Sequence, residues 1–146
     1  MEKAGLRAKG IFRMDASKRS KHTNAYFTGL GKSKRIVLFD TLLEAHTGEE
    51  ILAVLAHELE KRGLQVKRQK PVPIEFEGMR FEEGFRADLI VENCVVVELK
   101  SVEELPRVHS KQLLTYLRLL DYRLGLLINF GASVIKDGIH RIVNRL

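Results

Sequence analysis

Cysteine, tryptophan and proline are scarce in this sequence of 146 residues, which holds one cysteine, no tryptophan and three prolines. A single cysteine, Cys94, excludes an intramolecular disulfide, so we expect a protein of a reducing compartment, the cytoplasm. No stretch approaches the roughly 18 apolar residues of a membrane helix, and we expect no signal peptide. Internal repeats and a phosphate-cradling glycine loop are also missing from the sequence.

The composition is that of one globular domain, with 45% hydrophobic and 30% charged residues. A net charge of +6 and a pI near 9.6 favour a polyanionic partner such as nucleic acid. The charge is uneven, because residues 1–35 contain ten Lys or Arg and only two acids, Glu2 and Asp15. A solvated basic tail would therefore also explain the pI.

The sequence divides into a basic N-terminal arm, residues 1–40, and one α/β domain, residues 41–146. The arm has poor periodicity, which predicts weak order with short strands around Phe12 and Tyr26. Its last residues, Arg35–Asp40, are apolar enough to form a further strand. We expect most of the hydrophobic core in the second part.

The first strong helix signal is a capping box, in which Thr47 is followed three residues later by Glu50. The pattern predicts a helix to about Arg62, ended by Gly63. Its expected apolar face consists of Ile51, Leu52, Leu55 and Leu59.

The rest of the pattern predicts three antiparallel strands, a second helix and another strand. The segment Pro71–Phe76 is typical of an edge strand, because proline cannot donate to a ladder. A helix is expected over 107–120, and the apolar segment 124–130 after it predicts a central strand parallel to the one before the helix. A last strand is expected over 139–143. The stripe expected on the second helix is Val108, Leu113, Leu117 and Leu120.

Asp88 and Glu98 lie in or beside two apolar stretches, Ala87–Val91 and Cys94–Val97, and Lys100 follows Glu98 by two residues. Valine-rich strands are normally buried, and burying an unpaired carboxylate costs several kcal/mol. These charges therefore indicate a functional site, and a divalent metal is one explanation for them.

The loop between the two strands decides whether the carboxylates can meet. A two-residue turn at 92–93 would pair Asp88 with Val97 and point its side chain to the wrong face. A three-residue loop over 92–94, or a bulge in one strand, would pair Asp88 with Glu98 instead. A metal site therefore predicts one of these two irregular hairpins.

Two converging carboxylates suit Mg²⁺ or Mn²⁺, with coordination positions left for water and a phosphate oxygen. Lys100 could orient the water or neutralise developing charge, which favours hydrolysis of a phosphodiester in DNA or RNA. On the second helix, His109, Gln112 and Tyr116 share one face that can look at this site. The alternative is an exposed Gln112 and a Tyr116 at the edge of the core.

These residues also carry a resemblance. Asp88, Glu98, Lys100 and the spacing of Gln112 and Tyr116 resemble the PD-(D/E)xK nuclease-like superfamily. Over residues 51–146 the sequence is similar to the small GxxExxY proteins of that superfamily. The resemblance implies a nuclease-like α/β core behind the basic arm, Asp88 and Glu98 as metal ligands, Lys100 as the catalytic lysine and the other two as supporting residues.

A second resemblance covers residues 24–59, which are similar to the segment around the zinc helix of CAAX prenyl proteases. That family carries a His-Glu-x-x-His helix, whose two histidines bind zinc and whose glutamate acts as base. Here His57 and Glu58 are present, but Lys61 occupies the second histidine position. The two resemblances meet inside one helix, so the sequence is interpreted as a chimera with a broken protease site.

The chimera replaces the GxxExxY motif, whose positions fall on Ala45, Gly48 and Ile51. In this superfamily the first helix often contributes an acidic residue, and here Glu49 and Glu50 lie only one or two positions away from the motif glutamate. The leading hypothesis is a metal-dependent nuclease. The alternatives are an inactive nucleic-acid- or protein-binding member of the same fold, and the remnant of a zinc protease.

Overall fold

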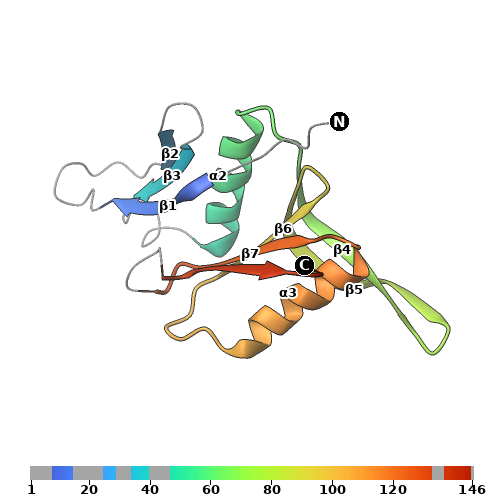
Figure 1. The fold of residues 1–146 in the computed structure, drawn as a ribbon. Coiled ribbons are helices and arrows are strands. Elements are labelled where there is room, and N and C mark those ends of the chain that lie inside the picture. The colour runs from blue at the N-terminus through green and yellow to red at the C-terminus, as the bar shows by residue number, and fades with distance from the viewer. Residues whose placement is uncertain (1–7, 15–24, 29–33, 40–46, 133–136, 146) are drawn as a thin grey trace.

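The computed structural model describes residues 8–14, 25–28, 34–39, 47–132 and 137–145. These residues form two sheets and two helices, an α/β fold as the sequence predicts. Figure 1 shows the elements from β1 to β8 along the chain. Their bounds are β1 (Ala8–Met14), β2 (Ala25–Thr28), β3 (Lys34–Phe39), α2 (Gly48–Glu60), β4 (Val66–Phe76), β5 (Met79–Val91), β6 (Val95–Lys100), α3 (Arg107–Leu119), β7 (Leu124–Asn129) and β8 (Ile139–Val143).

The larger sheet has five strands in the order β4-β5-β6-β7-β8. Its first three strands are antiparallel, and β7 runs parallel to β6 after the crossover through α3, as predicted. The two helices cover opposite faces of this sheet, because alternate strand residues pack against α2 and α3. In this three-layer arrangement Glu98 is buried, whereas Asp88 and Lys100 at the same strand ends are partly exposed.

The capping box at the start of α2 is present. The Thr47 hydroxyl accepts from the backbone N–H of Glu50, and the Glu50 carboxylate accepts from the backbone N–H of Thr47. The chain leaves the helix at Gly63, whose φ of +78° is a left-handed conformation that glycine adopts without strain. The buried apolar face of α2 consists of Ile51, Leu52, Leu55 and Ala56, and Leu59 is partly buried.

The second helix confirms most of its predicted stripe. Leu113 and Leu117 are fully buried against the sheet, and Leu120 packs at their edge. Val108 is 60% exposed, so its assignment to the stripe was wrong. Five residues separate it from Leu113, which turns it roughly 140° away from the buried side.

The hairpin between β5 and β6 has the three-residue loop that the metal hypothesis requires. Val91 pairs with Val95 and Leu89 pairs with Val97, so residues 92–94 form the loop. Glu92 and Asn93 both have φ near +50°, which allows the tight reversal. The same register extended by one step places Asp88 opposite Glu98.

The smaller sheet has the strand order β1-β3-β2. Its strands lie where the sequence predicts short strands around Phe12, around Tyr26 and over Arg35–Asp40, although Asp40 itself is outside the described residues. The segments that join these strands also fall outside the described residues. The division at residue 40 and the weak order of the arm stay predictions.

Candidate functional site

Asp88 on β5 and Glu98 on β6 hold each other's strands together through their side chains. The backbone N–H of Asp88 donates to Oε1 of Glu98 at 3.1 Å. The backbone N–H of Leu99 donates to Oδ2 of Asp88 at 2.9 Å. The two carboxylates therefore occupy the end of the hairpin ladder, where the strands would otherwise exchange backbone bonds.

Glu98 is the most buried carboxyl of the site, with 2% of the residue exposed. Burial raises the pKa of the Glu98 carboxyl from 4.5 to about 7, and the negative charge of Asp88 adds to this effect. Lys100 opposes the shift through its ammonium, which lies 3.4 Å from Oε2 of Glu98. The site thus brings together the three charged residues that the sequence predicted.

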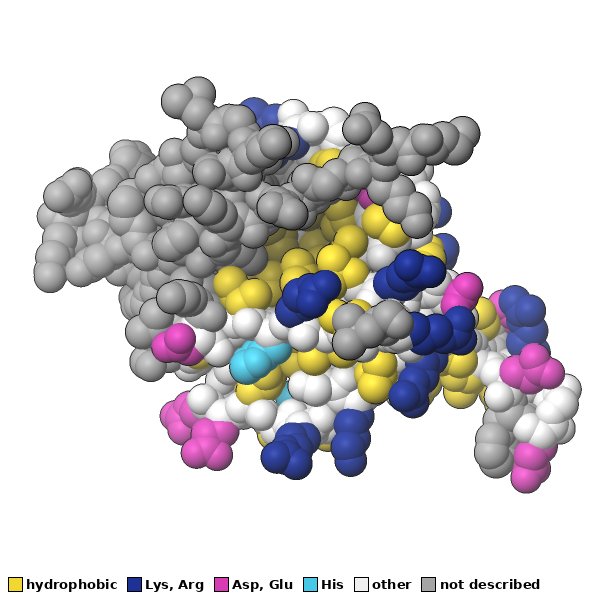
Figure 2. Space-filling model, viewed as in Figure 1, with side chains coloured by type: hydrophobic (Ala, Val, Ile, Leu, Met, Phe, Trp, Pro, Cys, Tyr) yellow, Lys and Arg dark blue, Asp and Glu magenta, His cyan; other side chains and the backbone are white. Residues whose placement is uncertain are grey.

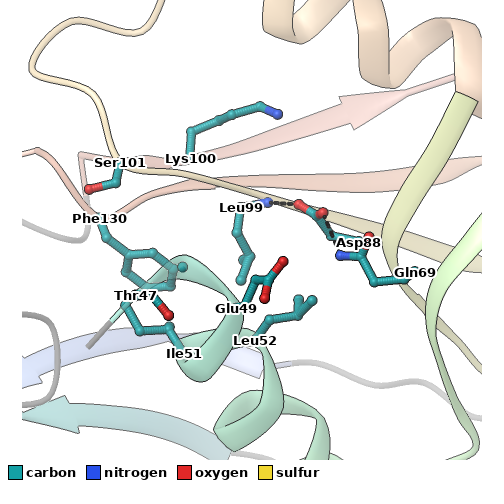
Figure 3. A pocket seen from close by; sticks show the side chains of 11 residues that line it. Thr47, Glu49, Ile51, Leu52, Gln69, Asp88, Leu99, Lys100, Ser101 and Phe130 are labelled. Atoms are coloured by element: carbon teal, nitrogen blue, oxygen red, sulfur yellow. Dashed lines mark hydrogen bonds between the residues drawn. The ribbon is translucent and has the colours of Figure 1, made fainter.

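A pocket of about 570 Å³ opens beside this cluster. Asp88 and Lys100 line it together with the start of α2, the end of β6 and the beginning of the loop after β7. Figure 3 shows Glu49 and Leu52 of α2 reaching towards Leu99 and Asp88, with Lys100 on the other side of Leu99. The remaining lining residues are Thr47, Gly48, Ile51, Gln69, Ser101 and Phe130.

Two of the three GxxExxY positions can be placed at this pocket. Gly48 and Ile51 line it, whereas Ala45 lies outside the described residues. Glu49, one position from the motif glutamate, is an exposed residue that also lines the pocket. An acidic side chain from the first helix is thus available at the rim, although among residues 47–132 and the other described segments no three His, Cys, Asp or Glu side chains form a ready metal cluster.

Gln112 and Tyr116 of α3 lie next to each other on the opposite side of the sheet from α2. The amide nitrogen of Gln112 donates to the Tyr116 hydroxyl at 2.5 Å, and the Tyr116 ring packs at 5.3 Å from the Phe85 ring of β5. Burial raises the pKa of the Tyr116 phenol above 10, and the charges of Glu98 and Asp88 raise it further. Tyr116 is therefore a neutral, buried hydroxyl close to the carboxylates, rather than a residue at the core edge.

Two further polar residues support the site, and sequence reasoning did not single them out. Gln69 of β4 donates from Nε2 to Oδ1 of Asp88 at 3.2 Å. Asn129, at the end of β7, accepts from the backbone N–H of Val102 at 2.9 Å and fixes the chain just after Lys100. Neither has a sequence signal, because each contact depends on which strands become neighbours.

Arg86 does not add a cation to the pocket. Its guanidinium lies 3.5 Å from the Glu83 carboxylate, and the exposure of both side chains makes this pair weak. A second Arg86 nitrogen donates to the backbone oxygen of Gln69 at 3.3 Å.

The donor set of the site fits a hard divalent cation. Asp88 presents a carboxylate to an open pocket, and Glu98 is a desolvated carboxyl whose ionised form is disfavoured until a positive charge approaches. Oxygen ligands without cysteine or histidine are those that Mg²⁺ and Mn²⁺ prefer. Among the described residues, Lys100 is the cation that pairs with Glu98.

Within the described residues, no group of three His, Cys, Asp or Glu side chains around the protease-like motif could hold a metal ion. His57 is exposed in the last turn of α2, and Lys61 caps the helix end with its backbone N–H bonded to the oxygen of His57. A protonated ammonium cannot bind zinc. No helix in the described part of the chain is long and apolar enough to cross a membrane.

Comparison with protein families agrees with the geometry of the larger sheet. A family model described as "PD-(D/E)XK nuclease superfamily" matches residues 45–142, which is most of the chain. The chain therefore belongs to the PD-(D/E)XK nuclease superfamily. No solved structure matches the chain significantly.

The N-terminal part is similar to a different family. A model described as "Peptidase family M48" matches residues 1–60. The chain is 58% identical over 59 residues to CAAX prenyl protease 1 of Saccharomyces cerevisiae, which covers 40% of this chain and 13% of the yeast protein. It is 55% identical over 51 residues to the probable CAAX prenyl protease 1 of Schizosaccharomyces pombe, covering 35% of this chain and 11% of that protein.

The chain thus spans only about an eighth of the length of these curated relatives. The human CAAX prenyl protease 1 homolog is 60% identical over 37 residues, which cover 25% of this chain and 8% of that protein. The two family matches overlap over residues 45–60, around α2. This combination is consistent with the chimera that the sequence predicted.

Proposed function

We propose that this chain is a divalent-metal-dependent nuclease-like protein that hydrolyses phosphodiester bonds of DNA or RNA. The observation that carries this proposal is the meeting of Asp88, Glu98 and Lys100 at one end of the β5–β6 hairpin, beside an open pocket. Membership of the nuclease superfamily supports the reaction class, although a fold by itself does not fix an activity.

Each residue has a distinct role in this proposal. Asp88 and Glu98 would hold Mg²⁺ or Mn²⁺, which when bound polarises the phosphodiester and lowers the pKa of a water. In the metal-free state Lys100 forms an ion pair with Glu98, and during hydrolysis it would stabilise the negative charge that develops on the phosphate. Gln112 and Tyr116 act from the other face, where the neutral Tyr116 hydroxyl can donate a hydrogen bond without adding charge.

A nucleic acid is the partner that the charge of the chain favours, with a net charge of +6. Figure 2 shows Lys and Arg side chains spread over one face of the molecule, with acidic side chains at the tip of the projecting β4–β5 hairpin. The exposed thiol of Cys94, in the β5–β6 loop, suits a reducing compartment, so we place the activity in the cytoplasm.

The proposal is tested by comparing wild type with Asp88→Ala and Lys100→Ala on plasmid DNA, single-stranded DNA and RNA. We expect cleavage in Mg²⁺ or Mn²⁺ that EDTA abolishes, and a loss of roughly 10²- to 10³-fold in each variant. Lys111→Ala, which removes an exposed lysine of α3, is the matched control and should cleave like wild type. Equal cleavage by all four proteins would indicate a contaminating nuclease and remove the proposal.

A smaller loss is expected for Tyr116→Phe, which removes the hydroxyl and keeps the buried ring. Because the hydroxyl acts beside the carboxylates rather than as a ligand, cleavage should fall about 10- to 100-fold while the ring contact with Phe85 preserves the fold. Gln112→Ala should fall by a similar factor, since Gln112 fixes that hydroxyl. Rates measured under single-turnover conditions check this, and unchanged rates in both variants would leave Tyr116 a core residue only.

The second candidate is a nucleic-acid- or protein-binding member of the fold that does not hydrolyse its ligand. It is favoured by the first helix, where Gly48 and Ile51 stand at the positions of the motif glutamate and tyrosine. Binding that survives Asp88→Ala and weakens steeply with salt, with no cleavage in any metal, would support it. In both candidates the protease-like segment is the remnant of a zinc protease, broken at Lys61.

A further inference from the structure

Gln69 has an unusual backbone at a place where β4 should be regular. Its neighbours Arg68 and Lys70 pair with Leu89 and Ala87 of β5, so Gln69 stands opposite Asp88. Its φ is +48°, a left-handed conformation that residues with a Cβ seldom adopt inside a strand. Such an outlier next to charged groups calls for a local cause.

The side chain of Gln69 gives that cause. Its amide Nε2 donates to Oδ1 of Asp88 at 3.2 Å, and both residues line the pocket, as Figure 3 shows. The other carboxylate oxygen of Asp88 accepts from the backbone N–H of Leu99 at 2.9 Å. Asp88 is therefore held from both neighbouring strands, by β4 at one oxygen and by β6 at the other.

The backbone of Gln69 is fixed as well. Its carbonyl oxygen accepts a hydrogen bond from the Arg86 guanidinium at 3.3 Å. The donor, Arg86, lies in β5 two residues before Asp88. The bond therefore stabilises the left-handed backbone of Gln69, which directs the amide towards Asp88. The arrangement sets the rotamer of Asp88 through two strands at once.

We propose that Gln69 is a positioning residue, which orients the carboxylate of Asp88 for a divalent cation. The inference rests on the proposed function. An amide suits this task because it fixes the carboxylate without cancelling its charge, whereas an Arg or Lys would compete with the cation. One bond to each oxygen also leaves further lone pairs of the carboxylate for the metal.

Two substitutions separate the amide from the backbone. Gln69→Ala removes the amide and keeps a Cβ at positive φ, whereas Gln69→Gly removes the amide and relieves the backbone. If Gln69 served only the strand, Gln69→Gly would bind metal like wild type. If the amide positions Asp88, both variants lose affinity, although Gln69→Gly melts at a higher temperature than Gln69→Ala.

The matched control is Gln65→Ala, four residues earlier. The Gln65 side chain accepts a hydrogen bond from Asn93 in the β5–β6 loop. This loop lies at the opposite end of the β5–β6 ladder from Asp88. The substitution therefore removes an amide of the same kind from the same part of the chain without touching Asp88. Circular dichroism verifies that all variants are folded before metal is added.

The experiment measures Mn²⁺ affinity by electron paramagnetic resonance on the full chain. We expect the Kd for Mn²⁺ to be 10- to 100-fold higher in Gln69→Ala and Gln69→Gly, and to change less than twofold in Gln65→Ala. A Kd within threefold of wild type in either Gln69 variant overturns the inference and leaves the proposed function intact. Wild type that binds no Mn²⁺ overturns the proposed function first, and with it any role of Gln69 towards a cation.

A spectroscopic arm needs no metal. In nitrogen-15 NMR spectra, the side-chain amide signals of Gln69 are those absent from Gln69→Ala, and they should move strongly in Asp88→Ala while those of Gln65 stay in place. Unmoved Gln69 signals would mean that the contact is absent in solution, which overturns the inference whatever the metal result.

Discussion

Glu98→Gln is expected to raise the free energy of unfolding of the metal-free protein at pH 8 by roughly 3 kcal/mol, while removing the proposed metal-dependent cleavage. The stabilisation follows from the pKa of Glu98, which burial and Asp88 raise from 4.5 to about 7. Above this pKa the folded protein contains a buried, ionised carboxylate that costs free energy, and each pKa unit corresponds to about 1.4 kcal/mol. Glutamine keeps the shape of Glu98 without this charge.

The pH dependence gives the sign of the effect. Between about pH 4.5 and 7 the folded protein holds a proton on Glu98 that the unfolded chain has lost. The raised pKa therefore stabilises the fold fully below pH 4.5, and this stabilisation disappears as pH rises through 7. Wild type and Glu98→Gln should be similarly stable at pH 4 and separate progressively up to pH 8.

Urea unfolding at several pH values, with EDTA present, measures this difference. Glu104→Gln is the control, because Glu104 is an exposed residue in the loop after β6. It should follow wild type at every pH. A Glu98→Gln protein that is less stable than wild type at pH 8 would show that the ion pair with Lys100 outweighs the cost of burial.

Asn129→Ala is expected to lower the free energy of unfolding by roughly 2 to 3 kcal/mol and also to weaken cleavage. Asn129 is 2% exposed, and its side chain accepts from Val102 and Gly131 and donates to the Val102 oxygen at 2.7 Å. Alanine leaves these backbone groups without partners, at a cost set by their desolvation. Because Val102 follows Lys100 by two residues, Lys100 loses part of its support.

Asn144→Ala provides the comparison for this second prediction. Asn144 is also buried, at 6% exposure, but its amide donates to the backbone oxygens of Leu117 and Tyr122 at the far end of α3. Its loss should lower stability by a similar amount. At a temperature where both variants are folded, only Asn129→Ala should cleave more slowly. Equal cleavage would mean that the loop after β6 keeps its place without Asn129.

Local signals in the sequence predicted the fold best. The capping box at Thr47 predicted where α2 begins, and Gly63 predicted where the chain leaves it, because both signals depend on neighbouring residues alone. The loop over 92–94 was one of the two irregular hairpins that the pairing of Asp88 with Glu98 predicted, and the register of β5 with β6 confirms it. Val108 shows the limit of reading apolar residues as a stripe when their spacing departs from the helical period.

The rest of the site depends on contacts between residues far apart in the sequence. Gln69 and Asp88 meet only because β4 pairs with β5, and Asn129 reaches Val102 only because β7 pairs with β6. Amide side chains in strands carry no pattern that predicts such partners. The raised pKa of Glu98 was likewise not predictable, because it arises from the burial of Glu98 in the folded chain and from the nearby Asp88.

The helix α2 is shared by the two matched families and contacts both sheets, β2 on one side and β4, β5 and β6 on the other. An exchange of genetic material inside an amphipathic helix conserves the fold when both parents carry their apolar residues in the same phase, since the packing surface is then continuous across the joint. Helices of this kind are places where recombination between unrelated genes can yield a folded protein in a single event.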